Sequence, residues 1–301
     1  MQTMLSVAAP AVLYLAGLFG FAYPLVRLQK RKQKGETSPL TGGLLHSPGV
    51  SLQSRIDDLG LDITTYIAAL PALPLLIYSL YLPWAQTRKI TTTSVLILAG
   101  VLLLLLIWIV FKISRLSTER NACRLSLDAE TSLGQELNQL MFNGFRVFHG
   151  FPADDFNIDH VAVGPTGVYA VETKERTRAV SKKGKVDATV IYDGDTLQFP
   201  SWYETESLLQ AQHQAEWLGE WLSNAVGSSV YVQAVLALPE WYVVRNVDRP
   251  VKVISGKEAS SLAKPSGVDL NDDMIRQIAQ QLEQRCRDME PVAYRLEQKE
   301  S

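Results

Sequence analysis

The sequence has few of the residues that build disulfide frameworks or zinc sites. Among its 301 residues there are two cysteines, Cys123 and Cys286, and neither belongs to a CxxC pair or a cysteine–histidine cluster. The four histidines are not paired at the spacing of zinc ligands. Two isolated cysteines exclude a disulfide-stabilised scaffold, and the histidine spacing argues against a structural zinc ion.

A phosphate-binding loop of the Walker A type is also missing. Gly256-Lys257 has neither the upstream glycine nor the following serine or threonine of that motif, so NTPase activity is not expected. The apolar runs of the chain contain no Asp, Glu, Lys, Arg or His deep within them. Transport of protons or ions along ionisable groups is therefore not supported.

Three long apolar runs are present in the first third of the chain, at about 4–28, 64–84 and 91–111. Each has about 20 residues, the length that a helix needs to cross the hydrocarbon core of a bilayer. We therefore expect a membrane region over residues 1–116 with three transmembrane helices.

The distribution of basic residues orients these helices. No basic residue precedes the first run, whereas Arg27, Lys30 and Arg31 follow it, which favours a retained anchor over a cleaved signal peptide. The loop after the first run and the segment after the third are the more basic ones. By the positive-inside rule we expect a multi-pass protein of the cell (inner) membrane, with its N-terminus outside and its C-terminal domain cytoplasmic.

The remainder of the chain has the pattern of a mixed α/β domain. We expect a linker or helix extension at 117–131, a domain at 132–263, and a C-terminal helix and tail at 264–301. Helical spacing covers 129–142, 203–222 and 271–287, with Asp269 or Asn271 as the cap of the last helix. Strands are predicted at 145–148, 157–163, 168–174, 189–192, 196–199, 230–238 and 251–254.

The strongest hairpin signal places three charged residues together. If Gly164 to Gly167 form the turn, Asp159 lies opposite Glu172. Side chains alternate along a strand and cross-strand partners share a face, so Asp159, Glu172 and Lys174 should converge on one patch. A register slip of one residue would separate them.

Two facing carboxylates repel each other, so a positive group should compensate. Lys174 is one candidate, and a divalent cation such as Mg²⁺, which takes oxygen ligands, is another. A cation held by Asp159 and Glu172 could activate water and polarise a phosphodiester, while Lys174 stabilises developing charge. The alternative is a solvated hairpin end with ordinary charges.

The order of these motifs resembles the nuclease-related (NERD) family, which is similar to the restriction-endonuclease-like fold. The resemblance rests on Gly134-Gln135-Glu136 on a helix, Asn157-Ile158-Asp159-His160, Val171-Glu172-Thr173-Lys174 and a later helix with Gln210. It implies a mixed sheet flanked by helices and a site that uses Mg²⁺ or Mn²⁺.

Carried over residue by residue, the resemblance implies that Asp159 and Glu172 bind the metal and that Lys174 is the catalytic lysine. Glu136 would be the accessory acid, and Gln210 would match the family's glutamine. Gln214 lies one turn after Gln210, where it either faces the site or belongs to a polar helix face. The family often has a glycine where this chain has Gln135, which leaves the local backbone approach open.

The charge of the C-terminal part is not that of a general nucleic-acid binder. Residues 121–301 include 18 basic and 26 acidic residues, a net charge of −8. Arg176 and Arg178 nevertheless begin a basic run at the site, which continues with Lys182, Lys183 and Lys185. This run could contact phosphates, or it could be a solvated loop or one that touches anionic lipid headgroups.

Two functions remain in competition. The first is a membrane-anchored, Mg²⁺-dependent nuclease that hydrolyses phosphodiester bonds, with DNA favoured over RNA as its substrate. The second is a catalytically inactive nuclease-like module that binds nucleic acid or a protein partner at the membrane. The lipid bilayer is a partner in both, and a homo-oligomer or a protein partner is compatible with either.

Overall fold

The computed structural model describes residues 45–87, 92–176, 188–245, 247, 250–265 and 269–293. The first predicted span, 4–28, and the basic residues Arg178, Lys182, Lys183 and Lys185 lie outside the described residues. The described chain forms two compact units. One comprises residues 56–121, and the other comprises residues 45–55 together with everything from Ala122 onward.

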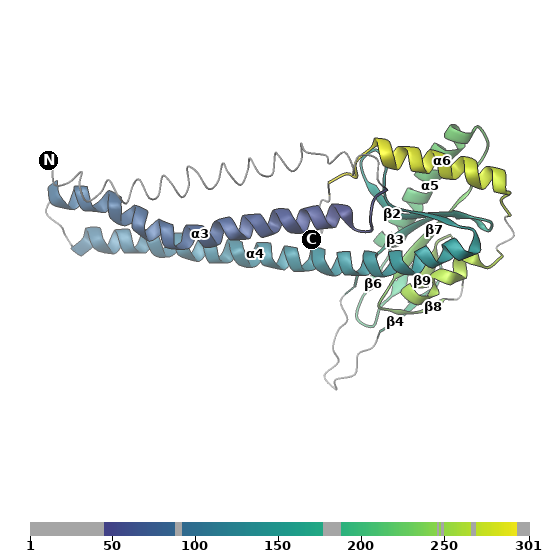
Figure 1. Cartoon of the computed structure of the whole chain (residues 1–301). Helices are drawn as coiled ribbons and strands as arrows, with labels where there is room; N and C mark the ends of the chain where they lie inside the picture. Colours follow the sequence, from purple (N-terminus) through teal and green to yellow (C-terminus); the bar gives the residue numbers. More distant parts are fainter. Residues whose placement is uncertain are drawn as a thin grey trace. The chain divides into compact units, whose positions relative to one another are not determined.

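The first unit consists of parts of two long helices, α3 (Val50–Thr87) and α4 (Thr92–Asn138). They lie side by side within this unit (Figure 1), where the rings of Tyr66 and Trp108 meet edge to face with centroids 6.0 Å apart. A Cβ on Gly60 would lie 3.4 Å from the guanidinium group of Arg120, an ordinary van der Waals distance, so the two helices are neighbours at this point as well.

One helix within the described residues is long and apolar enough to cross a membrane, and it is the one that contains the third predicted span. Most apolar side chains of its predicted span are exposed, with Leu104 at 68% and Phe111 at 69%. The second predicted span, 64–84, lies within α3. By length and apolar composition, α3 is not a second candidate for a membrane-spanning helix among the described residues. The predicted region of three transmembrane helices is therefore supported for one helix, as a weak indication from length and composition.

The second unit is a mixed α/β domain with two mixed sheets. Its five-stranded sheet has the order β1-β2-β3-β7-β9, in which β1, β2 and β3 are antiparallel neighbours while β3, β7 and β9 run parallel. The strands are β1 (Arg146–Pro152), β2 (Asn157–Gly164), β3 (Gly167–Thr173), β7 (Val232–Leu238) and β9 (Lys252–Ser255).

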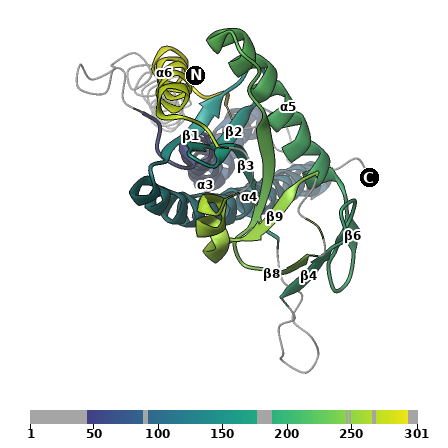
Figure 2. The same cartoon turned by 90° about the vertical axis from the view of Figure 1, so that its right-hand side faces the viewer.

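Helices cover both faces of this sheet. On one face, Leu133, Leu137 and Leu140 from α4 and the short helix η2 (Gln139–Asn143) pack against the sheet together with η3 (Gly256–Ala263). On the other face lie α5 (Glu206–Val226) and α6 (Asp272–Asp288), as Figure 2 shows. With helices on both faces, β3 is buried along its whole length.

The predicted hairpin has the predicted register. Val163 pairs with Val168 and His160 with Val171, so the next residues outward are Asp159 and Glu172. The turn is tight, since Gly164 pairs with Gly167 and two residues lie between them. Gly164 must also be small, because a Cβ there would lie 2.4 to 2.6 Å from atoms of the Phe145 ring. Local turn chemistry and alternation therefore fix the register that brings the acids together.

A smaller, four-stranded sheet has the order β6-β5-β4-β8. The predicted hairpin at Asp193-Gly194 is confirmed, since β4 and β5 are antiparallel and Oδ1 of Asp193 accepts the backbone N–H of Thr196 at 2.8 Å. No strand was predicted at the position of β8. The strands are β4 (Thr189–Tyr192), β5 (Leu197–Gln198), β6 (Tyr203–Glu204) and β8 (Tyr242–Arg245).

Several helix boundaries differ from the predicted ones. The segment 117–131 is part of the continuous helix α4, so the helix extension, and not a flexible linker, is what the structure has. The helix predicted from Tyr203 begins at Glu206, because Tyr203 and Glu204 form β6. The predicted cap of the last helix is confirmed: Oδ1 of Asn271 accepts the N–H of Met274 at 2.8 Å.

Candidate active site

The hairpin acids lie in a cavity of about 340 Å³ at the carboxyl end of β3. Its lining includes Glu130, Asp159, Glu172, Lys174, Arg176 and Gln210, which come from α4, β2, β3, the segment after β3, and α5. In α/β sheets the carboxyl ends of parallel strands are the usual place for ligands. The cavity is therefore the natural place to examine the predicted chemistry.

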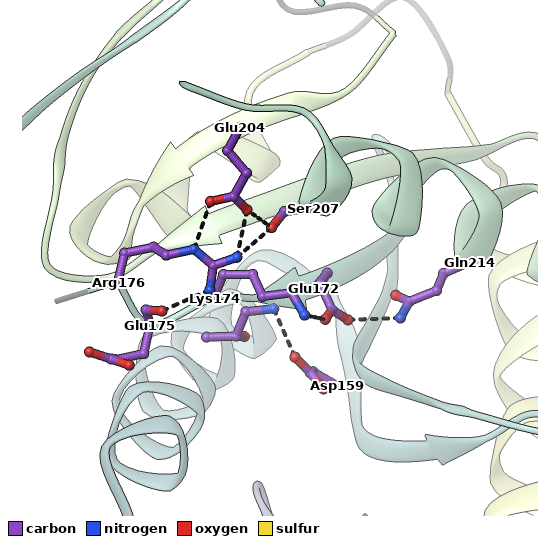
Figure 3. Close-up of polar contacts among 9 residues, drawn as sticks. Asp159, Glu172, Lys174, Glu175, Arg176, Glu204, Ser207 and Gln214 are labelled. Carbon is purple, nitrogen blue, oxygen red and sulfur yellow. Dashed lines mark hydrogen bonds and ion pairs between the residues drawn. The ribbon is translucent and has the colours of Figure 1, made fainter. Parts of the chain in front are cut away.

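Asp159 and Glu172 approach each other from neighbouring strands (Figure 3). Oδ2 of Asp159 accepts the backbone N–H of Thr173 at 2.8 Å, which ties the start of β2 to the end of β3. Glu172 is 4% exposed. A buried carboxylate needs partners for its oxygens, and the contacts of Glu172 supply them.

Each oxygen of Glu172 has a donor. Nζ of Lys174 lies 3.1 Å from Oε1, and Nε2 of Gln214 donates to Oε2 at 2.8 Å (Figure 3). Lys174 is held in turn by its backbone, whose N–H donates to the carbonyl of Ala237 on β7 at 3.0 Å. The predicted convergence of Asp159, Glu172 and Lys174 is what the structure has.

The acid that α4 brings to this cavity is Glu130 and not Glu136. Glu130 lines the cavity and is 9% exposed, whereas Glu136 is not among the lining residues. The two acids flank the apolar stripe of Leu133 and Leu137 on opposite sides, since six residues correspond to more than one and a half helical turns. The side of α4 that carries Glu130 faces the cavity at the carboxyl end of β3.

The crowding of carboxylates raises the pKa values of two of them. Burial, together with the charge of Glu172, raises the pKa of Glu130 to about 8. Burial and the charges of Glu130 and Glu172 raise the pKa of Asp159 well above its ordinary value. The hydrogen bond from Thr173 and the charge of Lys174 act in the opposite direction but are outweighed. The site therefore has more negative charge than its one lysine balances.

This donor set fits a hard divalent cation. Carboxylate oxygens are the ligands that Mg²⁺ prefers, and it keeps several water ligands when bound by one or two carboxylates. Across the described residues, no group of three or more His, Cys, Asp or Glu side chains is arranged to hold a metal ion. A cation at Asp159 and Glu172 would accordingly complete its shell with water and substrate oxygens.

Comparison with protein families identifies the segment that builds this site. Residues 126–239 match the model of the nuclease-related domain. No curated protein and no solved structure matched the chain. The match supports the NERD resemblance, and the restriction-endonuclease-like architecture stays a prediction.

The nuclease-related segment contains every acid of the cavity and ends just after β7. Its later glutamines have different positions. Gln210 lines the cavity, whereas Gln214 is 2% exposed and contacts Glu172. Gln135, where the family often has glycine, is exposed, and Gly134 is the residue that needs to be small: a Cβ there would lie 2.7 Å from Pro48.

The nuclease-related segment also holds Arg176 in a network that the sequence did not reveal. Its guanidinium donates to both oxygens of Glu204, at 2.8 and 2.5 Å, and to Oγ of Ser207 at 2.8 Å (Figure 3). Oγ of Ser207 also donates to Glu204. A bidentate pair of this kind fixes the guanidinium plane, so Arg176 ties the segment after β3 to the start of α5.

Proposed function

We propose that this protein is a metal-dependent nuclease that hydrolyses phosphodiester bonds of DNA or RNA. The observation that carries the proposal is the convergence of Asp159, Glu172, Lys174 and Glu130 on one cavity of the nuclease-related segment. Several carboxylates gathered around one lysine suit metal-assisted hydrolysis of a phosphodiester.

Each residue has a role that follows from its contacts. Asp159 and Glu172 would hold Mg²⁺ or Mn²⁺, and such an ion would polarise the phosphodiester and favour deprotonation of water. Lys174, already next to Glu172, would stabilise negative charge on the phosphate oxygens. Gln214 keeps Glu172 in place through its hydrogen bond to Oε2. Glu130, with its raised pKa, is placed to hold or release a proton near the reacting group.

The nuclease would be anchored in the cell membrane. The apolar part of α4 supports a membrane anchor, and the basic residues that follow the predicted spans favour a cytoplasmic position for the nuclease-related segment. A reporter fused to the C-terminus tests this orientation: a reporter active only in the cytoplasm should be active, and one active only outside should be silent.

The decisive test uses the full chain in detergent. Labelled single- and double-stranded DNA and RNA are incubated with Mg²⁺ or Mn²⁺ and one protein: wild type, Lys174→Ala, Asp159→Asn, or the control Lys257→Ala. The side chain of Lys257 is exposed and is not part of the cavity lining. Cleavage by wild type and the control, lost in the other two variants and in EDTA, is expected. If wild type does not bind the metal and does not cleave any substrate, the nuclease proposal is wrong. The catalytically inactive binding module is then the better interpretation.

A further inference from the structure

The C-terminal segment of the chain returns to the active-site cavity. After α6 ends at Asp288, residues 290–293 run to the start of β2, and Val292 and Ala293 form part of the cavity lining. We call residues 290–293 the C-terminal strap. The strap lies outside the nuclease-related segment, which ends at residue 239.

One side chain holds the strap by two hydrogen bonds. Nδ2 of Asn157 donates to the carbonyl of Val292 at 2.7 Å, and Oδ1 of Asn157 accepts the N–H of Val292, also at 2.7 Å. Both contacts are made to the backbone of the strap, so they do not depend on the side chain at position 292. A carboxamide that pairs its donor and acceptor with one residue is a specific, built contact.

Asn157 places this contact beside the reacting acids. Asn157 and Asp159 are two residues apart on β2, so their side chains point to the same face, roughly 7 Å apart along the strand. The origin of the strap is fixed as well. Arg285, near the end of α6, donates to the carbonyl of Pro152 at 2.6 Å and to Oδ1 of Asp154 at 3.0 Å.

We propose that the C-terminal strap reversibly covers the active-site cavity and competes with nucleic acid for a subsite formed by Asn157. A carboxamide offers a donor and an acceptor side by side, and this pair matches the edge of a nucleobase as well as a peptide backbone. The competition part of this inference rests on the proposed nuclease function. The covering of the cavity does not.

The contacts suit a reversible cover. Each hydrogen bond contributes modestly to stability, because water competes for both groups when the strap leaves. A substrate that offers Asn157 equivalent partners, together with phosphate contacts at Lys174, would displace the strap. The strap would then lower the apparent affinity for substrate without altering the acids that perform the chemistry.

Two substitutions at position 292 distinguish the backbone contact of the strap from the effect of its side chain. Val292→Pro removes the N–H that Asn157 accepts, whereas Val292→Ala keeps it and serves as the matched control. The first measurement uses the full chain and acetylation of Lys174, which lines the same cavity, by an amine-reactive ester followed by mass spectrometry. The second measures binding of a short fluorescent single-stranded DNA by anisotropy.

In Val292→Pro we expect both the acetylation rate of Lys174 and the affinity for the oligonucleotide to rise, by roughly fivefold to thirtyfold for the loss of one or two hydrogen bonds. Val292→Ala should behave as wild type. In Asn157→Ala the acetylation should rise as well, but the affinity should rise less, because the subsite is lost with the strap contact.

The outcomes distinguish the two proposals. Equal acetylation and equal affinity in Val292→Pro and Val292→Ala overturn the strap. Faster acetylation in Val292→Pro, with no oligonucleotide bound by any variant, upholds the cover of the cavity and overturns the competition, while the cleavage assay decides the nuclease function separately. Equal gains of affinity in Asn157→Ala and Val292→Pro uphold the cover and reject Asn157 as a substrate subsite.

Discussion

Gln214 donates a hydrogen bond from its side-chain amide to Oε2 of Glu172, at 2.8 Å, from a helix 42 residues later in the chain. Both residues are buried, at 2% and 4% exposure. The oxygen of the same amide, Oε1, is buried without a hydrogen-bond partner among the described residues. The amide therefore orients an acid of the site while keeping an acceptor available inside the domain.

Replacement of Gln214 by leucine should weaken the site without unfolding it. Leucine fills a similar volume but leaves Oε2 of Glu172 without this donor, and loss of such a supporting contact typically costs about tenfold to hundredfold in metal affinity or activity. Titration of cleavage with Mg²⁺ measures the effect. Gln212→Leu, on the same helix but paired with the exposed Glu216, is the control and should leave the titration unchanged. An unaltered Mg²⁺ dependence in Gln214→Leu would show that the amide does not position Glu172.

Glu130 and Glu136 should differ in their importance for cleavage. We expect Glu130→Gln to lower the rate, because Glu130 lines the cavity beside Asp159 and Glu172, whereas Glu136→Gln should retain the wild-type rate. Single-turnover cleavage at saturating substrate compares the two variants on equal terms. The reverse result would return the accessory role to Glu136, as the family resemblance implied.

Glu130 should also make the metal-free protein less stable as the pH rises. Its pKa is raised from 4.5 to about 8 in the folded state. The folded state therefore holds a proton that the unfolded state has lost, and stability falls between pH 4.5 and 8, by on the order of 5 kcal/mol. Thermal unfolding in EDTA at pH 6 and pH 8 should show a smaller loss in Glu130→Gln than in wild type. Identical pH dependence in the two proteins would contradict the raised pKa.

His149 should make the fold sensitive to acid. Its Nδ1 lies 2.9 Å from Nδ1 of His160 and its Nε2 lies 3.1 Å from Oδ1 of Asn138, and burial lowers its pKa from 6.5 to about 4. Below pH 6.5 the unfolded chain binds a proton on this imidazole that the folded chain does not bind. The contribution to stability is therefore complete above pH 6.5 and falls toward pH 4, by on the order of 3 kcal/mol. Urea unfolding of wild type and His149→Phe across this range should give a shallower decline for the variant. Parallel declines would assign the acid sensitivity to other groups.

Gly164→Ala should destabilise the hairpin by about 1–3 kcal/mol, since its Cβ would overlap the ring of the buried Phe145. The double variant Gly164→Ala/Phe145→Leu provides the matched test, because a smaller side chain at 145 gives room for the methyl group. Chemical unfolding should show recovery relative to the sum of the two single changes. Simple additivity would mean that the two positions are not in contact.

The parts of the site that could be predicted are those set by local rules. The turn at Gly164 to Gly167 determines the register, and alternation along the strands places Asp159, Glu172 and Lys174 on one face. These three residues require no knowledge of how the helices pack. The order of elements in the mixed α/β domain likewise followed from periodicity and turn residues.

The parts that could not be predicted depend on packing between distant segments. Glu130 and Glu136 flank the same apolar stripe, and periodicity does not say which flank meets the strand ends. Gln210 and Gln214 lie one turn apart, and the depth at which α5 packs decides which of them reaches Glu172. The contact between Asn157 and Val292 spans 135 residues and has no local signature.

The parallel strand β9 has a consequence for how small a functional piece of this protein can be. The residues that match the nuclease-related domain stop at 239, but β7 forms its outer ladder with β9, where Leu236 pairs with Val253 and Ala237 with Ile254. A fragment cut at 239 would present a long, apolar, unpaired strand edge and would also lose α6, which covers β1 and β2. Such an edge is a template for aggregation. We therefore expect that the segment with the candidate site does not fold by itself, and that its solubility depends on the 49 residues that follow it up to Asp288.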